Sequence, residues 1–224
     1  MRDKLFKDIS IIIPFYNEEE NVEPVISEIM EKVPGAEIVA VDDGSTDATL
    51  ERLQKFPSVR IHSFFENLGQ GFAVHAGLEI ASNEYCVIMD GDGQYDPSVI
   101  PGLVGALMNA DLVCGWRQNR RDSGNVILAS KFSNSVRRMV LGDNVKDAGG
   151  IKALRRSPAL RHLKPFEGMH RYIPSIFFRA GLAITEIPVA HRSRKSGRSK
   201  YTHLGRAARG IVDLVRVGVS YYSR

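Results

Sequence analysis

Short apolar runs alternate with amphipathic stretches through the first half of the chain. The runs are rich in Val and Ile and predict strands, whereas the stretches between them repeat apolar side chains every three or four residues and predict helices. Regular alternation of the two predicts an α/β domain with a mostly parallel, twisted sheet and helices on both faces. The expected strands are 9–14, 37–41, 59–64, 85–89 and 112–116, and the expected helices are 18–32, 47–55, 71–81 and 97–110.

The pattern loosens after Trp116. We expect a polar loop, a helix over 126–141, a short Gly-rich segment at 148–150, a helix near 169–179 and a strand over 183–190. A basic loop then leads to a last helix that begins near residue 202. We therefore divide the chain into a domain over 1–201 and a C-terminal basic amphipathic helix over 202–224.

The last helix has one apolar stripe and an opposite polar face rich in arginine. One interpretation is a helix packed on its own domain. The other is a helix at a membrane surface, which the arginines and the pair Tyr221 and Tyr222 favour. The same stripe can also form a homodimer contact. The stripe consists of Leu204, Ala207, Ala208, Ile211, Val212, Val215 and Val219, with Arg206, Arg209, Asp213, Arg216 and Ser220 opposite.

Length and composition indicate one globular domain. A chain of 224 residues with 43% hydrophobic and 25% charged residues can bury one sizeable core, and no apolar stretch approaches the roughly 20 residues that span a bilayer. No signal peptide precedes the first strand, and Cys86 and Cys114 both lie in apolar strand-like runs. We therefore expect reduced structural thiols and a cytoplasmic protein.

Charge is distributed unevenly along the chain. Residues 1–116 contain 7 Lys/Arg against 20 Asp/Glu, whereas residues 117–224 contain 23 against 6. An acidic half that can hold a metal and a basic half that can hold phosphates suit a nucleotide diphosphate, an anionic acceptor or an anionic membrane surface. Nucleic acid is disfavoured, because the basic residues lack the interleaved aromatic residues of a stacking platform.

Polar clusters follow three of the predicted strands. They are 14–18, 42–45 and 90–94, and parallel strands bring their carboxyl ends to one edge, where such sheets bind ligands. Asp90 and Asp92 supply hard oxygen ligands of the kind that Mg²⁺ or Mn²⁺ takes when it carries phosphates. Asp42 and Asp43 by themselves are equally explained as helix caps.

Three other motifs do not fit these clusters. A calcium-binding loop that begins at Asp90 would need glycine at its sixth position, where the chain has Tyr95. A dinucleotide fold would need a Gly-rich turn after the first strand, and 14–19 contains no glycine. Haloacid dehalogenase phosphatases use an Asp-x-Asp-Gly turn near the N-terminus, whereas three predicted strands precede it here.

Six segments, in this order, resemble the family 2 glycosyltransferases of the GT-A fold. The segments after residue 146 are similar to the polyprenyl-phosphate branch, which includes dolichyl-phosphate mannose synthases and bacterial undecaprenyl-phosphate sugar transferases. The resemblance runs from about Ile9 to Tyr201. Its segments are 12–18 (IIPFYNE), 42–47 (DDGSTD), 67–69 (NLG), 89–94 (MDGDGQ), 147–152 (DAGGIK) and 191–201 (HRSRKSGRSKY).

The resemblance implies a metal-dependent transferase that uses a nucleotide-sugar. It places the nucleoside on Pro14, Tyr16, Glu18 and Asp42, with Asp43 and Gly91 also on the donor side. It places Mg²⁺ or Mn²⁺ on Asp90, Asp92 and Gln94. The basic residues that it brings to the phosphates are Arg117, Arg194 and Lys200, and it adds Asp92, Arg117, Lys131 and Asp147 as the catalytic set.

The implied acceptor is a polyprenyl phosphate. Its oxygen is already anionic, so the reaction needs little general-base help. It needs a second phosphate site, which Lys131, Asn134, Ser135 and Arg138 can supply from one helix face, although a solvated polar face explains them as well. His170 and Arg171 are weaker candidates, and Trp116 and Tyr95 are expected to serve packing.

Three positions depart from the pattern of many relatives. Gln70 stands where a basic residue is frequent, Gly149 where Ser or Cys is common, and Lys131 where Arg is frequent. Many relatives also continue into transmembrane helices, whereas this chain stops at Arg224. We therefore expect a peripheral protein on the inner face of the membrane. A family 2 transferase with a glycan acceptor, or a catalytically silent nucleotide-sugar binder, are the alternatives.

Overall fold

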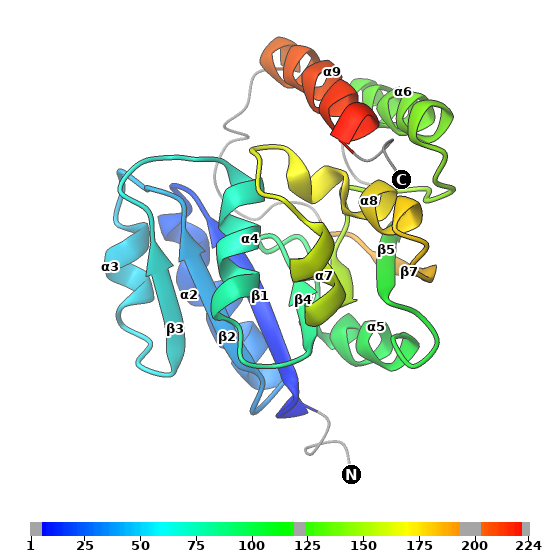
Figure 1. Cartoon of the computed structure of the whole chain (residues 1–224). Coiled ribbons are helices and arrows are strands. Elements are labelled where there is room, and N and C mark those ends of the chain that lie inside the picture. Colours follow the sequence, from blue (N-terminus) through cyan, green and yellow to red (C-terminus); the bar gives the residue numbers. More distant parts are fainter. Residues whose placement is uncertain (1–5, 119–123, 193–202, 221–224) are drawn as a thin grey trace.

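One seven-stranded sheet forms the centre of the computed structural model, which describes residues 6–118, 124–192 and 203–220, without the side chains of 124–132, 203–209 and 211. The strands lie in the order β3-β2-β1-β4-β6-β5-β7 (Figure 1). They are β1 (Ile9–Phe15), β2 (Glu37–Asp42), β3 (Val59–Ser63), β4 (Tyr85–Ile88), β5 (Leu112–Gln118), β6 (Lys152–Arg155) and β7 (Ile184–Ala190).

Six of the seven strands point the same way. β1 pairs in parallel with β2 and with β4, and β5 pairs in parallel with β7. β6 runs antiparallel between β4 and β5, so that those two strands are parallel to each other. The carboxyl ends of the six parallel strands therefore share one edge of the sheet with the amino end of β6.

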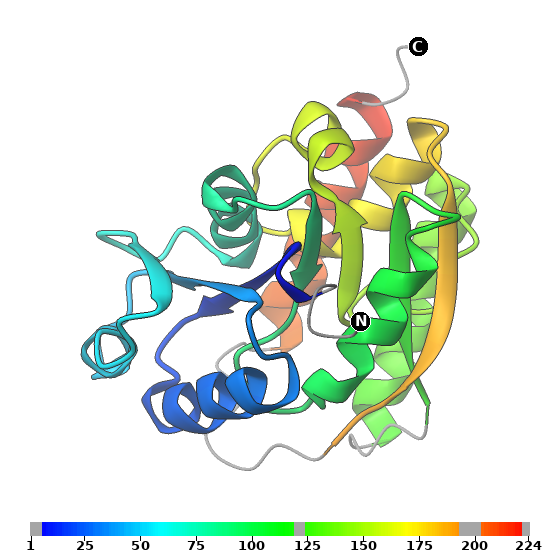
Figure 2. The same ribbon diagram turned by 90° about the horizontal axis from the view of Figure 1, so that it is seen from below.

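Helices cover both faces of the sheet, which confirms the predicted fold class (Figure 2). One core cluster packs α2 and α5 against one face, and a second packs α4, α7 and α8 against the other. The helices are α2 (Glu19–Lys32), α3 (Thr49–Leu53), α4 (Gln70–Ile80), α5 (Ile100–Ala106), α6 (Gly124–Leu141), α7 (Arg156–His162), α8 (Ile173–Arg179) and α9 (His203–Ser220), with 3₁₀ turns at η1 (Pro97–Val99) and η2 (Met169–Arg171).

Two elements were not predicted from the sequence, the strand β6 and the helix α7 that follows it directly. β6 is only four residues long and has a basic residue at each end, so it lacks an apolar run. It is a strand because both its edges pair, with β4 on one side and β5 on the other. The first backbone N–H of α7, at Arg156, donates to the Glu84 carbonyl oxygen at 2.7 Å.

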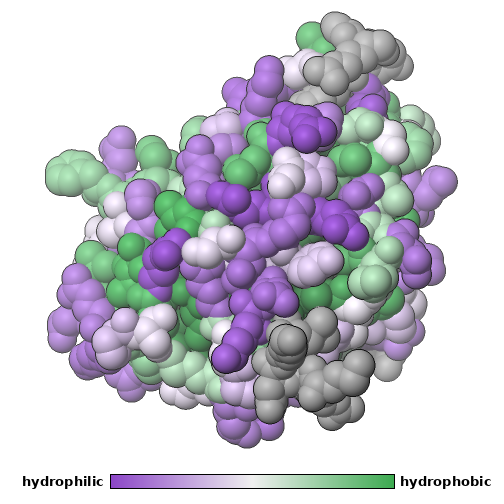
Figure 3. Space-filling model, turned by 60° about the horizontal axis from the view of Figure 1, so that its bottom comes forward, coloured by the Kyte–Doolittle hydropathy of each residue, from purple (hydrophilic) through white to green (hydrophobic). Residues whose placement is uncertain are grey.

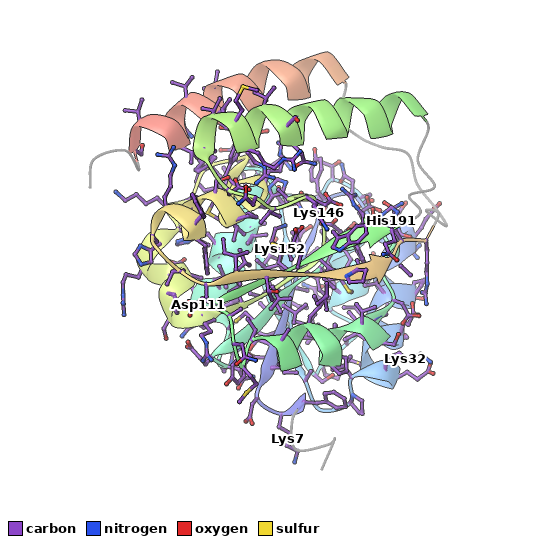
Figure 4. All side chains as sticks on the ribbon, turned by 90° about the vertical axis from the view of Figure 1, so that its right-hand side faces the viewer. Lys7, Lys32, Asp111, Lys146, Lys152 and His191 are labelled. Carbon is purple, nitrogen blue, oxygen red and sulfur yellow. The ribbon has the colours of Figure 1, made fainter. Side chains whose placement is uncertain are left out.

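The helices α6 and α9 lie side by side and form an outer layer (Figures 1 and 4). The helix α9 packs on the rest of the domain, as one of the two interpretations has it, but over the described side chains it does not pack through the predicted apolar stripe. Val212, Val215 and Val219 are 60%, 59% and 68% exposed, while Asp213, assigned to the polar face, is buried together with Val217. The helix is docked through the face that carries Asp213, and the valines point outward.

The remaining surface is mixed. On the face that Figure 3 displays, hydrophilic residues spread across the middle and hydrophobic residues form smaller areas on either side. Among the helices that the structure describes, none combines the length and the apolar character that crossing a bilayer requires.

Candidate donor and metal site at the carboxyl edge of the sheet

The loops after β1 and β2 are bonded to each other. Asn17 has a positive φ of 51°, and its side-chain oxygen accepts hydrogen bonds from the backbone N–H groups of Thr46 (2.6 Å) and Asp47 (3.3 Å). In return, the backbone N–H of Asn17 donates to the Ser45 hydroxyl at 2.8 Å. These bonds fix the segment 14–18, which carries the predicted nucleoside contacts Pro14, Tyr16 and Glu18.

The two aspartates after β2 have different surroundings. Asp42 is buried and accepts from the Ser63 hydroxyl at 2.9 Å and from the backbone N–H of Ser45 at 3.3 Å. Asp43 accepts from the backbone N–H groups of Leu68 (2.9 Å) and Gly69 (3.0 Å). Asp43 therefore holds the loop before α4 by hydrogen bonds. Its contact with the donor remains a prediction.

Burial affects the titration of Asp43. Burial raises the pKa of its carboxyl above the ordinary value, and the hydrogen bonds from Leu68 and Gly69 only partly oppose that rise. The backbone hydrogen bonds from Leu68 and Gly69 thus offset part of its cost of burial.

The predicted metal ligands follow β4. The Oδ1 atom of Asp90 accepts from Nε2 of Gln70 at 2.7 Å, and that of Asp92 accepts from the backbone N–H of Gln94 at 3.1 Å. The side-chain amide of Gln94 donates to the Arg192 carbonyl oxygen at 3.2 Å. The Nε2 atom of Gln94 thus ties the metal loop to the end of β7, and its carbonyl oxygen is the atom suited to a cation.

These residues fit a divalent cation that arrives with a diphosphate. In the described part of the chain, no group of three or more His, Cys, Asp and Glu side chains is arranged to hold a metal by itself. A pair of carboxylates completed by phosphate oxygens and water is the way in which Mg²⁺ is usually bound. The donor set of Asp90 and Asp92 matches this chemistry.

Arg117 and Asp147 form a bidentate ion pair at the end of β5. Nε of Arg117 donates to Oδ2 of Asp147 at 2.7 Å, and a terminal nitrogen donates to Oδ1 at 2.9 Å. Burial alone would lower the pKa of the guanidinium, but the hydrogen bonds and charge of Asp147 raise it above its ordinary value. A Cβ at Gly149 would lie 3.1 Å from a terminal nitrogen of Arg117, so glycine at this position leaves room for the pair.

Lys152 is a buried cation to which the sequence analysis assigned no role. It begins β6, where its Nζ donates to the Gly150 carbonyl oxygen at 2.8 Å, and Figure 4 shows it toward the interior. Burial lowers the pKa of its ammonium, and the charges of Asp90 and Asp147 oppose that shift. In the sequence, the signal that could have marked Lys152 is its place at the end of the motif 147–152.

The side chains of several predicted basic contacts lie outside the described part of the structure. Arg194 and Lys200 lie outside the described residues, and the side chain of Lys131 on α6 is also outside the description. Arg192, which precedes that basic segment, pairs with Glu28 at 2.8 Å and with Asp96. Arg192 itself lies beside the metal loop, because its backbone N–H and carbonyl oxygen both bond to Gln94.

His170 lies in η2, and Lys152 and Arg171 are among its charged neighbours. Burial, followed by the charges of Arg171 and Lys152, lowers the pKa of its imidazole well below the ordinary value. The ring is therefore neutral at physiological pH. A neutral ring can contact a donor sugar by hydrogen bonding but not by charge, so the weak prediction for His170 stays open.

Comparisons with known proteins identify the family of the chain. The family model described as glycosyl transferase family 2 matches residues 10–164. Dodecaprenyl-phosphate galacturonate synthase of Rhizobium johnstonii is 34% identical, over 94% of this chain and 66% of that protein. Undecaprenyl-phosphate 4-deoxy-4-formamido-L-arabinose transferase of Edwardsiella ictaluri is 31% identical, over 88% of this chain and 64% of that protein. The chain thus spans slightly less than two thirds of these relatives.

Solved structures share the fold. Glucosyl-3-phosphoglycerate synthase from Mycobacterium tuberculosis, in complex with Mn²⁺, UDP and glucosyl-3-phosphoglycerate, superposes with a TM-score of 0.75 at 26% identity, covering 97% of this chain and 82% of that chain. A structure of the same synthase with Mg²⁺ and UDP gives a TM-score of 0.74.

Proposed function

The chain belongs to glycosyl transferase family 2, and on that basis we propose that it transfers one sugar from a nucleotide-sugar to a polyprenyl phosphate, with inversion at the sugar carbon. The observation that carries the proposal is the meeting of two groups at one sheet edge. The carboxylates of Asp90 and Asp92 follow β4, and Arg117, near the carboxyl end of β5, pairs with Asp147 in the loop before β6. The similarity to transferases named for polyprenyl-phosphate products supports the choice of acceptor.

The donor nucleoside lies along the loops after β1 and β2, on Pro14, Tyr16, Glu18 and Asp42. The backbone N–H of Thr46 donates to the Asn17 side-chain oxygen, and the backbone N–H of Asn17 donates to the Ser45 hydroxyl, so these two loops are held together before the donor arrives. A site that is already ordered loses little further conformational freedom on binding, and it holds the reacting sugar in one orientation.

Asp90 and Asp92 would hold the divalent cation, with the side-chain oxygen of Gln94 as a further ligand. When bound, the cation neutralises the diphosphate as it leaves. Asp147 engages two of the five N–H donors of Arg117, and the remaining donors of that guanidinium bind a phosphate oxygen. Arg117 thus stabilises the same developing charge from the side of β5.

The acceptor supplies its own nucleophile. An anionic phosphate oxygen of the lipid bonds to the anomeric carbon of the sugar, while the bond from that carbon to the diphosphate oxygen breaks. The nucleoside diphosphate leaves with the electron pair, so no protein group has to remove a proton. One displacement without a covalent enzyme intermediate inverts the configuration.

The outer layer of α6 and α9 is the surface that meets the lipid. α6 contains no acidic residue, and the one acidic residue of α9, Asp213, is buried. Arg138 on α6 is exposed, as are Arg216, Val212 and Val215 on α9, and the described part of these helices presents no exposed acidic side chain to neutralise the arginines. Basic and apolar side chains together fit an anionic lipid surface, whereas a second copy would bring like charges together.

Product release tests the acceptor. Purified protein with Mn²⁺ or Mg²⁺ is incubated with UDP- and GDP-linked sugars, with and without a polyprenyl phosphate in detergent, and nucleoside diphosphate is measured. We expect release that depends on the lipid phosphate. The fold shared with a synthase crystallised with glucosyl-3-phosphoglycerate keeps a soluble phosphorylated or glycan acceptor as the second candidate, and lipid-independent release with such an acceptor would favour it.

Replacement of one metal ligand tests the chemistry. Asp92→Asn keeps the size of the side chain but removes its charge, and we expect at least a ~100-fold loss of turnover, since a bound cation supplies several kcal/mol of charge stabilisation. Asp8→Asn, at an exposed position just before β1, is the matched control and should retain wild-type turnover. Near-normal activity of Asp92→Asn with an unchanged Tm would contradict the metal assignment.

A further inference from the structure

Gln70 is the first residue of α4, directly after the N-cap Gly69. The Nε2 atom of Gln70 donates to Oδ1 of Asp90, which follows the neighbouring β4, at 2.7 Å. Both side chains are half-buried at the carboxyl edge of the sheet. We infer that Gln70 is a positioning residue that orients the Asp90 carboxylate toward the divalent cation. This inference rests on the proposed metal site and is independent of the acceptor.

The backbone on the N-terminal side of Gln70 is fixed because Asp43 accepts hydrogen bonds from the N–H groups of Leu68 and Gly69. Gly69 has a φ of +100°, a conformation that side chains with a Cβ rarely adopt. A Cβ at this position would also lie 2.3 Å from Cγ of Glu167. The chain can enter α4 along this path only with glycine at 69.

The backbone on the C-terminal side is fixed by the segment before η2. The N–H of Gly71 donates to the Glu167 carbonyl oxygen at 2.8 Å. A Cβ at Gly71 would lie 2.0 Å from the carbonyl oxygen of Phe166. With glycines held in close contact on both sides, the Cα–Cβ direction of Gln70 is set by the fold, and its amide reaches Asp90 from a fixed base.

The bond to Gln70 settles which way the carboxylate of Asp90 faces. An amide N–H that occupies Oδ1 restricts rotation of the carboxyl group, and Oδ2 is left to face the cation. Metal-binding side chains are commonly held by a second hydrogen-bonding residue in this manner. Because the amide is neutral, it orients Asp90 without adding a positive charge that would repel the metal. Arg117 and Lys152 already act on Asp90 as charges.

Binding of Mn²⁺ and nucleotide tests the inference without any acceptor. Gln70→Ala removes the donor, and Gln70→Asn keeps an amide that is one methylene too short to reach Asp90. We expect both variants to bind Mn²⁺ about 10- to 100-fold more weakly in the presence of UDP or GDP, whichever the wild type binds. Calorimetry gives the affinity, and the electron paramagnetic resonance signal of free Mn²⁺ gives an independent value.

Three comparisons separate positioning from a structural role. Nucleotide affinity without metal should stay within about 2-fold of wild type. The Tm should change little, because the side chain is only half-buried and its bond is to the site residue Asp90. Gln54→Ala, at the exposed end of α3, is the matched control and should bind Mn²⁺ as the wild type does.

Each result decides the inference. Wild-type Mn²⁺ affinity in Gln70→Ala or in Gln70→Asn would overturn it and leave the proposed function standing. An equal loss of nucleotide affinity with and without metal would also overturn it, because the defect would then lie in the nucleotide site. Failure of the wild-type protein to bind Mn²⁺ with either nucleotide would contradict the metal site itself. Activity that does not depend on lipid would instead contradict only the proposed acceptor.

Discussion

The donor edge and the outer helical layer are built in contrasting ways. At the donor edge, polar side chains are bonded to the backbone of neighbouring loops, as Asn17 is to Thr46 and Asp43 is to Leu68. In the outer layer, the inward face of the helices holds a few buried polar contacts. Tyr172 donates to the Gly210 carbonyl oxygen at 2.7 Å, and the Arg137–Asp143 pair joins α6 to the loop before β6. The outward face is apolar and basic.

The contrast follows from what each region is proposed to bind. A nucleotide-sugar is a polar molecule of defined shape, so an edge with few internal degrees of freedom gains affinity and orientation. A lipid surface has no fixed shape, and it is recognised by buried apolar area and by charge. The donor edge can therefore be damaged by loss of a single hydrogen bond, whereas the outward face should respond in proportion to the apolar area removed.

The largest loss of stability is expected when Arg137, in the outer helical layer, is replaced. Its guanidinium is buried and bonded to Asp143 and to the Val145 carbonyl oxygen. Arg137→Ala leaves Asp143 as a buried charge that has lost its cation, which costs about 3–5 kcal/mol. We expect a Tm lower by roughly 10 °C. Neighbouring exposed Arg138→Ala should change the free energy of unfolding by less than about 0.5 kcal/mol.

The same variant shows whether the layers are independent. If the outer layer only covers the domain, Arg137→Ala should bind UDP or GDP with Mn²⁺ as the wild type does at 10 °C, where the remaining fold is populated. Loss of nucleotide binding in parallel with loss of the outer layer would show that the two regions form one cooperative unit.

At the donor edge, we expect the replacement of Asp43 to lower both stability and binding. Asp43→Ala leaves the N–H groups of Leu68 and Gly69 without their acceptor, at a cost of about 2–4 kcal/mol by the usual penalty for buried unsatisfied donors. We expect lower stability in urea and weaker binding of Mn²⁺ in the presence of nucleotide, because Gln70 follows the released loop. Asp8→Ala at an exposed position should change neither. Full Mn²⁺ affinity in Asp43→Ala would show that the loop is held by other contacts.

The sequence predicted the donor edge more completely than the outer layer. Apolar runs marked five strands, of which β1, β2, β4 and β5 are largely buried, and the polar turns after β1, β2 and β4 marked the site. β6 was missed because its pairing with β4 and β5 is tertiary and leaves little trace in the run Lys152–Arg155. Helical periodicity placed α9, but it could not show which face packs, since Asp213 docks against Gly168, where a Cβ would lie 2.0 Å from its Oδ2 atom.

Within the site, residue types were predictable and their partners were not. The motif 89–94 marked Asp90 and Asp92, yet the bond from Gln70 depends on where α4 starts in space. Asp42 ends β2 and Asp43 follows it directly, so their adjacency in sequence does not show that one bonds to Ser63 and the other to Leu68.

A smaller effect is expected from acid at the junction of the two regions. The pKa of His170 lies well below that of an unfolded histidine, about 6.5, because of burial and the charges of Arg171 and Lys152. As pH falls through 6.5 the unfolded chain binds the proton first, so stability is lost by at most ~1.4 kcal/mol per pH unit for this group. His170→Gln should flatten the stability curve between pH 6.5 and 5, measured by urea unfolding. Parallel curves for variant and wild type would show that His170 does not contribute.

The smallest effect on stability, and a clear effect on partitioning, is expected on the outward face of α9. Val212 and Val215 are exposed, so Val212→Ser with Val215→Ser should change the free energy of unfolding by less than about 1 kcal/mol. If these side chains enter a lipid surface, two valines contribute enough apolar burial for the double variant to bind anionic vesicles about 10-fold more weakly or worse. Co-sedimentation with vesicles of anionic and of neutral lipid measures the difference. High salt should weaken the wild type as well, because the arginines contribute by charge.

Met108→Ser is the control for this comparison. Met108 is 74% exposed and follows α5, at the opposite end of the molecule from α9 in Figure 1. Vesicle binding by this variant should equal that of the wild type, since only the outer layer faces the lipid. An equal loss at Met108 would mean that binding depends on general hydrophobicity. A wild-type dimer in solution that the valine substitutions dissociate would instead assign the face to a second copy. The outward valines would then serve assembly, and the lipid phosphate would have to be reached from the donor edge alone.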